Sequence, residues 1–144
     1  MGRIIKNGRV LDPANRLDKV CDILIEDGKI AKVGADLSAA GAEIINAAGK
    51  VVAPGLIDMH VHLREPGQEA KEDFASGSRA GAAGGYTTIA TMPNTRPVVD
   101  DAALVTSLKK RAEDVAVIHI EIIGAVTKNQ EGKELAELGD MVEA

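Results

Sequence analysis

Residues 52–67 constrain this chain more than any other stretch, because they combine an apolar strand pattern with two closely spaced histidines. In a β-strand, residues two apart project from the same face, so the side chains of His60 and His62 are expected to point the same way. Asp58 shares this spacing, and Arg64 does too if the extended backbone continues that far. The residues between them are apolar and predict that the opposite face of the strand is buried: Ile57, Met59, Val61 and Leu63.

The two histidines favour a metal site at the end of this strand, since neutral imidazole is a preferred ligand of zinc and similar divalent ions. Pro54 and Gly55 set a sharp entry to the strand, and the sequence at 65–67 breaks regular structure directly after the polar groups. The histidines are therefore expected near the C-terminal end of the strand, where α/β barrels carry their chemistry. The competing interpretation is a pair of ordinary hydrogen-bonded core histidines.

The pattern of the sequence changes near residue 53. Before that point, short β-prone runs alternate with turn signals, including Asn7-Gly8 between two predicted strands and Asp27-Gly28 in a predicted type I′ hairpin. After it, strands alternate with helices, which predicts a parallel sheet with right-handed crossovers. Beyond the histidine strand, the predicted helices span 69–83, 100–112 and 135–143, and the predicted strands span 87–92 and 115–123.

Composition narrows the classes of function. The net charge of -5, with no basic cluster, argues against nucleic acid or an anionic membrane as the partner. Cys21 is the only cysteine, which excludes a disulfide within these residues and a cysteine-rich metal site. No stretch has the length and apolar character of a signal sequence or a membrane span, so a cytoplasmic protein is expected.

Two motifs together resemble those of a known family. The sequence PGLIDMHVHLREPG at 54–67, followed by MPNTRP at 92–97, resembles the signatures of the cyclic amidohydrolases of the amidohydrolase superfamily. Within that group the chain is most similar to the dihydroorotases, of the type associated with aspartate transcarbamoylase. The resemblance covers essentially the whole chain, but only as the N-terminal third of a family member.

The resemblance implies an α/β fold in two parts. Residues 1–53 are expected to form half of a small β-sandwich, and residues 54–144 the first three β/α units of a metal-dependent (β/α)8 TIM-like barrel. A complete barrel needs eight strands and about 250 residues, so we expect the chain to be a fragment of a protein about three times as long. The isolated fragment is expected to be inactive and poorly folded, because its sheet would lack neighbouring strands at both edges.

The resemblance also assigns roles to individual residues. It makes His60 and His62 ligands of one or two Zn2+ ions, and Asp58 a residue that supports these ligands or anchors the strand. It makes Arg64 and Asn94 the groups that bind a substrate carboxylate, which suits the forked guanidinium of arginine. The simpler interpretations are a surface charge for Arg64 and an Asx turn for Asn94, and such a turn is compatible with substrate binding.

The catalytic groups themselves are not expected within this chain. In the family, the carboxylate that bridges the metals, two further histidines and a catalytic aspartate come from later strands, beyond Ala144. His119 falls outside both motifs and is interpreted as structural. Glu121, on the same predicted face of its strand, has no assigned role.

The implied activity is that of a zinc-dependent dihydroorotase, which reversibly hydrolyses dihydroorotate to N-carbamoyl-L-aspartate in de novo pyrimidine biosynthesis. An allantoinase or hydantoinase-type enzyme is the alternative, and Arg64 and Asn94 argue against it because those substrates lack the matching carboxylate. A third interpretation is a catalytically inactive homologue that serves as an assembly partner of aspartate transcarbamoylase. The full-length protein is expected to be a homo-oligomer.

Overall fold

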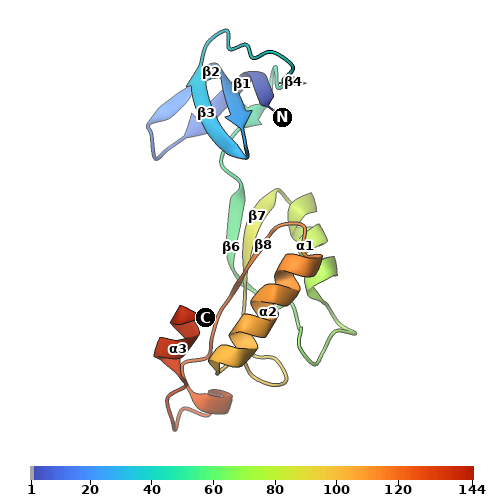
Figure 1. Ribbon diagram of the computed structural model, residues 1–144, viewed down its shortest axis with the longest axis vertical. Helices are drawn as coiled ribbons and strands as arrows, with labels where there is room; N and C mark the ends of the chain where they lie inside the picture. The colour runs from blue at the N-terminus through green and yellow to red at the C-terminus, as the bar shows by residue number, and fades with distance from the viewer. Residues whose placement is uncertain (1) are drawn as a thin grey trace. The chain divides into compact units, whose positions relative to one another are not determined.

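The structure is a computed structural model that describes residues 2–144 in two compact units, one ending at Pro54 and the other spanning Gly55–Ala144 (Figure 1). The first unit contains the strands β1 (Arg3–Asp12), β2 (Leu17–Glu26), β3 (Lys29–Gly34), β4 (Glu43–Asn46) and β5 (Val51–Val52). The second contains β6 (Leu56–Val61), α1 (Phe74–Ala83), β7 (Tyr86–Thr91), α2 (Ala102–Val115), β8 (His119–Ile122), the short 3-10 helix η1 (Lys128–Gln130) and α3 (Leu138–Glu143). No helix in residues 2–144 has the length and apolar character needed to cross a membrane.

The first unit is a five-stranded sheet in the order β3-β2-β1-β4, with β5 also paired to β1. β1 and β2 are antiparallel, whereas β4 and β5 run parallel to successive parts of β1. β2 and β3 form the hairpin predicted at Asp27-Gly28, where both residues have the positive φ that a type I′ turn requires. Val10, Cys21 and Ile23 form the buried centre of the unit. The prediction of an all-β segment is confirmed.

The prediction of a chain reversal at Asn7-Gly8 is wrong. β1 continues through both residues, and its pairing with β2 shifts between Ile5 and Gly8, which marks a β-bulge. Asn7 has a φ of 63°, and its backbone N–H donates to the Asp22 carboxylate at 3.0 Å. Asparagine and glycine accommodate a positive φ in bulges as well as in turns, so the local sequence does not distinguish the two.

Asp22 is a buried carboxylate that fixes this irregular part of the sheet. Its side chain is 7% exposed, and it accepts hydrogen bonds from the backbone N–H groups of Asn7 at 3.0 Å and Leu37 at 3.1 Å. Asp22→Ala leaves both donors without this acceptor, so we expect the first unit to lose about 1–3 kcal/mol of stability. Hydrogen exchange of the β1 and β2 amides measures this loss. Asp18→Asn is the control, because Asp18 lies on the same strand and its ion pair with Arg9 is exposed to water and contributes little to stability.

The same carboxylate gives the first unit a defined pH dependence. The backbone N–H of Asn7, with the Leu37 N–H and the charge of Lys6, holds the pKa of Asp22 below its ordinary value. The stability that ionised Asp22 contributes is complete above the unfolded-state pKa of about 3.9, and it is lost as the pH falls through the lower folded-state pKa. Asp22→Asn should therefore weaken the acid dependence of stability in this unit. An acid limb identical to that of the wild type would contradict the assignment.

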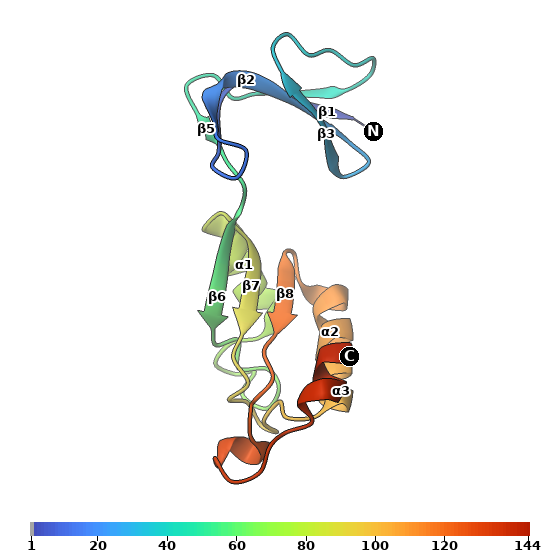
Figure 2. The same cartoon turned by 90° about the vertical axis from the view of Figure 1, so that its left-hand side faces the viewer.

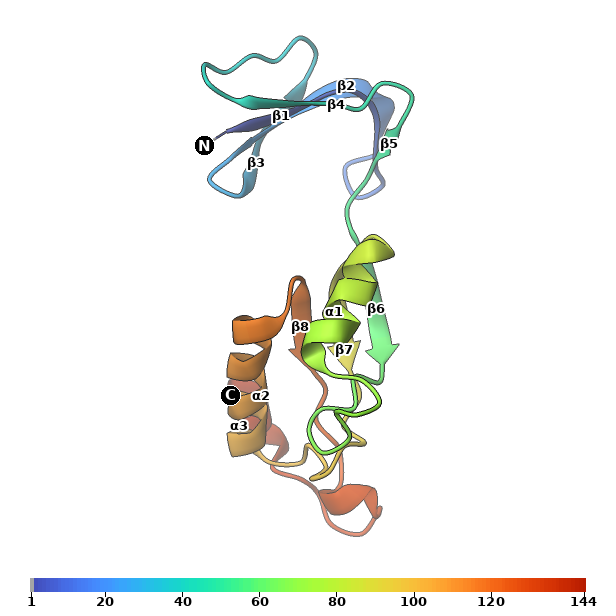
Figure 3. The same ribbon diagram turned by 90° about the vertical axis from the view of Figure 1, so that its right-hand side faces the viewer.

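The second unit contains a parallel three-stranded sheet in the order β6-β7-β8, whose strands all point the same way (Figure 2). α1 packs against β7 and β8, and α2 packs against β8, so both helices lie on one face of the sheet (Figure 3). Leu63, Phe74, Ile89, Val105 and Leu108 form the centre of the core between the sheet and the helices. The predicted alternation of strands and helices is confirmed, and it brings the loops that follow β6 and β7 to one end of the sheet.

The boundaries of all three helices differ from the prediction, and α3 begins at Leu138 because Leu135 pairs with Thr127 in a β-bridge. α1 begins at Phe74, later than expected, because Asp73 caps it by accepting a backbone N–H of the first turn at 2.6 Å. Glu69, predicted to lie in the first turn of this helix, instead accepts the backbone N–H of Gly67 within the preceding loop at 2.7 Å. α2 continues past its predicted end to Val115, so the following strand starts later than expected.

The prediction of a buried face on the histidine strand is wrong for the first half of β6. Val61 packs against the core and Leu63 is 1% exposed, as expected. Ile57 and Met59 are 64% and 77% exposed. In the described part of the chain β6 pairs with β7 alone, and neither helix packs against it. An apolar pattern shows what a strand is able to bury, whereas actual burial depends on which elements lie beside it.

Candidate active site

The two motif loops meet at the C-terminal end of the parallel sheet. The first loop follows β6 and the second follows β7, and the backbone N–H of Arg96 donates to the carbonyl oxygen of Pro66 at 3.0 Å. A bond of 2.8 Å from the backbone N–H of Met92 to the carbonyl oxygen of Val61 continues the pairing of the two strands. The motifs are therefore brought together by neighbouring parallel strands, whose carboxyl ends lie at the same edge of a sheet.

His60 and His62 lie close together, with ring centroids 5.3 Å apart and ring planes at 64°. The Nδ1 atom of His62 is 2.8 Å from the Oδ1 atom of Asn94. Because an amide oxygen only accepts hydrogen bonds, this contact suits the His62 tautomer that carries its proton on Nδ1 and offers the Nε2 lone pair to a metal ion. Metal-binding histidines commonly have an outer partner of this kind. The sequence motifs did not predict the contact between Asn94 and the ring.

Asp58 does not lie in one row with the histidines. It pairs with Ile89 of β7, and the next pair of the ladder begins only at Val61, so Met59 and His60 together lie opposite a single residue. This β-bulge interrupts the alternation on which the single-row prediction depends. The Asp58 carboxylate accepts the backbone N–H of His60 at 3.0 Å. The bond supports a role in anchoring the strand rather than contact with an imidazole ring.

Arg64 occupies a turn between two buried residues, Leu63 and Glu65. Its φ is 64°, and the backbone N–H of Glu65 donates to the carbonyl oxygen of Leu63 at 2.8 Å, which closes a γ-turn around it. A positive φ of this kind costs a non-glycine residue on the order of 1–3 kcal/mol, and such strain is concentrated at ligand-binding positions. None of the ion pairs within residues 2–144 includes Arg64. Its guanidinium donors are therefore available to a ligand.

The two imidazoles fit part of a zinc site. Zinc is usually bound by four ligands, and His60 and His62 supply two nitrogen donors of the preferred type. Within residues 2–144, no three histidine, cysteine or carboxylate side chains come together as a metal site. The donor chemistry of the pair suits zinc, and the remaining ligands are not among the described residues.

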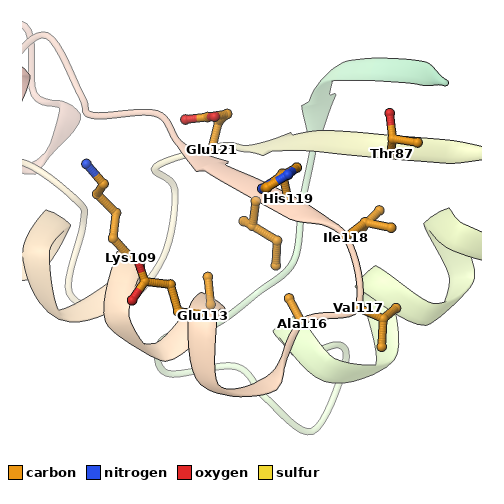
Figure 4. Close-up of a pocket in the computed structure, with 10 residues that line it drawn as sticks. Thr87, Lys109, Glu113, Ala116, Val117, Ile118, His119 and Glu121 are labelled. Carbon is orange, nitrogen blue, oxygen red and sulfur yellow. The ribbon is translucent and has the colours of Figure 1, made fainter. Parts of the chain in front are cut away.

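A groove of 590 Å³ lies elsewhere in the second unit, along β8 and α2 (Figure 4). Lys109 and Glu113 of α2 and His119 and Glu121 of β8 are among the residues that line it, and no residue of the two motifs is. His119 and Glu121 are both exposed, so neither is a core residue. None of the side chains of the two motifs, including the paired histidines, lines this groove.

Glu65, predicted only to be part of a break in regular structure, has two defined partners. Its side chain is 9% exposed; Oε2 accepts the backbone N–H of Phe74 at 2.9 Å, and Oε1 accepts the Nε–H of Arg111 at 2.8 Å. The hydrogen bond to Glu65 raises the pKa of Arg111 above its ordinary value. Glu65 and Arg111 are 46 residues apart, and no local pattern links them. In the sequence, the only sign of a role for Glu65 is a charged residue directly before the turn-forming pair Pro66-Gly67.

Gly67 allows the two motif loops to approach each other. Its φ is 88°, and a Cβ atom at this position would lie 2.1 Å from the carbonyl oxygen of Arg96. Gly67→Ala should force the loops apart. Beyond the cost of placing alanine at a positive φ, we expect this clash to lower the free energy of unfolding of the second unit by about 1–3 kcal/mol. Gly85→Ala is the matched control, because Gly85 has a φ of 85° and nothing lies within 4 Å of the added carbon. Urea unfolding followed by circular dichroism compares the two variants, and equal losses would contradict the steric argument.

An all-β segment followed by β/α units, with an H-x-H pair at the carboxyl end of the first parallel strand, has the architecture of the amidohydrolase class. Residues 49–144 match the Dihydro-orotase-like family, and the chain belongs to that family.

Curated relatives share this sequence over nearly its whole length. A dihydroorotase of Syntrophotalea carbinolica is 54% identical over 141 residues, which are 98% of this chain and 33% of the relative. Dihydroorotases of Geobacter sulfurreducens and Solibacter usitatus are 49% and 52% identical over 100% and 96% of this chain, and over 34% and 32% of their own lengths. The chain thus spans about a third of the length of the curated relatives it matches.

Solved structures show the same fold. A D-hydantoinase has a TM-score of 0.78 and 35% identity over 99% of this chain and 29% of its own chain. The L-hydantoinase of Arthrobacter aurescens has a TM-score of 0.77 and 33% identity over 88% of this chain and 28% of its own. The predicted α/β fold class is confirmed by these similarities.

Proposed function

We propose that the protein is a zinc-dependent dihydroorotase, which reversibly hydrolyses the ring amide of dihydroorotate to give N-carbamoyl-L-aspartate. The observation that carries this proposal is the contact between the two motifs: Asn94 is hydrogen bonded to His62, and Arg64 follows His62 by two residues. An arginine fork and an amide beside paired imidazoles suit a ring substrate that carries a carboxylate. Membership of the Dihydro-orotase-like family supports the same substrate.

Each motif residue has a separate task in this proposal. His60 and His62 hold Zn2+, with one or two ions per full-length subunit, and Asp58 preserves the bulge that presents His60. Bound zinc lowers the pKa of a water molecule to about 7 and polarises a carbonyl group. Arg64 binds the substrate carboxylate with its forked donors. The amide nitrogen of Asn94 can donate to the same carboxylate while its oxygen keeps His62 in the required tautomer.

A hydantoinase or allantoinase-type activity is the second candidate, and the similarity to solved hydantoinase structures favours it. A hydantoin ring carries no carboxylate, so Arg64 and Asn94 would have no matching group. The third candidate is an inactive homologue that only assembles with aspartate transcarbamoylase. The presence of both His60 and His62 argues against this reading.

A ring-hydrolysis assay on the full-length, zinc-loaded protein tests the three candidates with dihydroorotate, hydantoin and allantoin. We expect kcat/KM for dihydroorotate to exceed that for the uncharged rings by about 10⁴-fold, because a site built for a carboxylate leaves its charge unpaired without one. A preference for hydantoin or allantoin would support the second candidate. Stoichiometric zinc with no hydrolysis of any ring would support the third.

Several further properties of the full-length protein belong to the same proposal. It acts in the cytoplasm, forms a homo-oligomer, and is associated with aspartate transcarbamoylase. Residues 1–144 expressed alone should lack activity, because two imidazoles do not complete a zinc site.

A further inference from the structure

The turn that carries Arg64 is held from both sides. Leu63 is 1% exposed and belongs to the core under α1 and α2, and Glu65 is 7% exposed. The backbone between these two buried residues closes around Arg64 with a φ of 64°. A strained conformation of this kind persists only where the surrounding structure determines it. The contacts that hold Leu63 and Glu65 in place therefore also fix the position and direction of the Cα–Cβ bond of Arg64.

The neighbours are held by different interactions. Leu63 is fixed by apolar packing, whereas Glu65 uses both carboxylate oxygens, one for the backbone N–H of Phe74 and one for Arg111. Phe74 is the first residue of α1, and Arg111 lies on α2. Glu65 therefore joins the turn to both helices. The side chain of Arg111 is 48% exposed and that of Glu65 is 9% exposed. Without Arg111 the buried carboxylate would lose the one charged partner that it has among residues 2–144, and it would be drawn towards water.

Stability alone does not account for an ion pair at this place. The Arg111 side chain is 48% exposed, and ion pairs that water reaches contribute only about 0–1 kcal/mol to stability. A carboxylate with two directed hydrogen bonds, however, fixes the orientation of the backbone that follows Arg64 more narrowly than apolar contacts would. A narrowly fixed backbone at this point is useful when the Arg64 side chain has to point in one direction.

We propose that Glu65 and Arg111 are a positioning pair, which keeps the turn at Arg64 in the left-handed conformation that presents its guanidinium to a substrate carboxylate. Both residues act through the backbone of Arg64, so neither is a catalytic residue. The inference rests on the proposed function for the identity of the group that Arg64 binds. The conformational part of the inference concerns this chain alone.

Steady-state kinetics of the full-length, zinc-loaded protein test the pair. Arg111→Met should raise KM for dihydroorotate about tenfold or more, equivalent to about 1.4 kcal/mol, with little change in kcat or zinc content. Arg111→Lys keeps the charge and one donor and should restore most of the wild-type KM. Lys110→Met is the matched control, because Lys110 is the exposed neighbour on the same helix. If Arg111→Met does not fold, Glu65→Gln removes the ion pair while keeping an acceptor for Phe74.

A crystal structure of the Arg111→Met or Glu65→Gln variant gives a readout that does not depend on activity. We expect φ of Arg64 to leave the left-handed region, and a retained φ near the wild-type value would overturn the inference. A lower melting temperature with an unchanged KM would also overturn it, because that result indicates a purely structural pair. Failure of the proposed function has a different signature, namely a wild-type protein that does not hydrolyse dihydroorotate. The crystallographic comparison then still decides the role of the pair.

Discussion

Replacing His60 or His62 with alanine in the full-length protein is expected to remove the bound zinc and the ring-hydrolysis activity together. The two rings are 5.3 Å apart, and each is expected to supply one nitrogen to a site that needs four ligands. Loss of either ring leaves an incomplete set, so the two variants should behave alike. We expect kcat/KM to fall on the order of 10³-fold, equivalent to about 4 kcal/mol of transition-state stabilisation. Zinc content by atomic absorption and dihydroorotate turnover are the two measurements.

His119→Ala is the matched control for these variants. His119 is exposed on β8, and it lies in a groove that contains no motif residue. Its removal should leave zinc content and turnover unchanged. If His60→Ala and His62→Ala both kept the zinc content of the wild type, the rings would not be ligands, and the interpretation as ordinary hydrogen-bonded histidines would be correct.

Arg64→Ala should weaken the binding of dihydroorotate more than it slows the chemical step. Truncating one member of a buried, hydrogen-bonded charge pair costs about 2–5 kcal/mol, which corresponds to a rise in KM of about 30-fold to several thousandfold. The carboxylate of the substrate is remote from the amide that is cleaved, so most of this loss should appear in KM. Steady-state kinetics with dihydroorotate provide the measurement.

Two further variants make the test of Arg64 specific. Arg64→Lys keeps the charge but not the planar fork, so its KM should lie between those of the wild type and Arg64→Ala. Arg79→Ala removes an exposed arginine of α1 and should leave KM unchanged. An unaltered KM in Arg64→Ala would show that the residue is a surface charge.

Local chemistry predicted the parts of the fold that depend on neighbours in the sequence. The hairpin at Asp27-Gly28 requires a positive φ at both residues, and few dipeptides supply it as readily. The alternation of strands and helices after Pro54 follows from a change in hydrophobic period. The reversal predicted at Asn7-Gly8 failed because these residues also suit a bulge, and the carboxylate that stabilises the bulge comes from another strand.

The sequence by itself determined which chemical groups stand at the ends of the parallel strands. Two histidines, an arginine and an asparagine occupy two short motifs, and residue type and spacing are properties of the chain alone. Only the tertiary structure decided how these groups are oriented. The bulge moves Asp58 out of the histidine row, Asn94 contacts His62 from the loop after the neighbouring strand, and Glu65 joins the Arg64 turn to Arg111. Each of these contacts links residues that the folded backbone brings together, or depends on a register that the partner strand sets, and a pattern read along one segment does not contain that information.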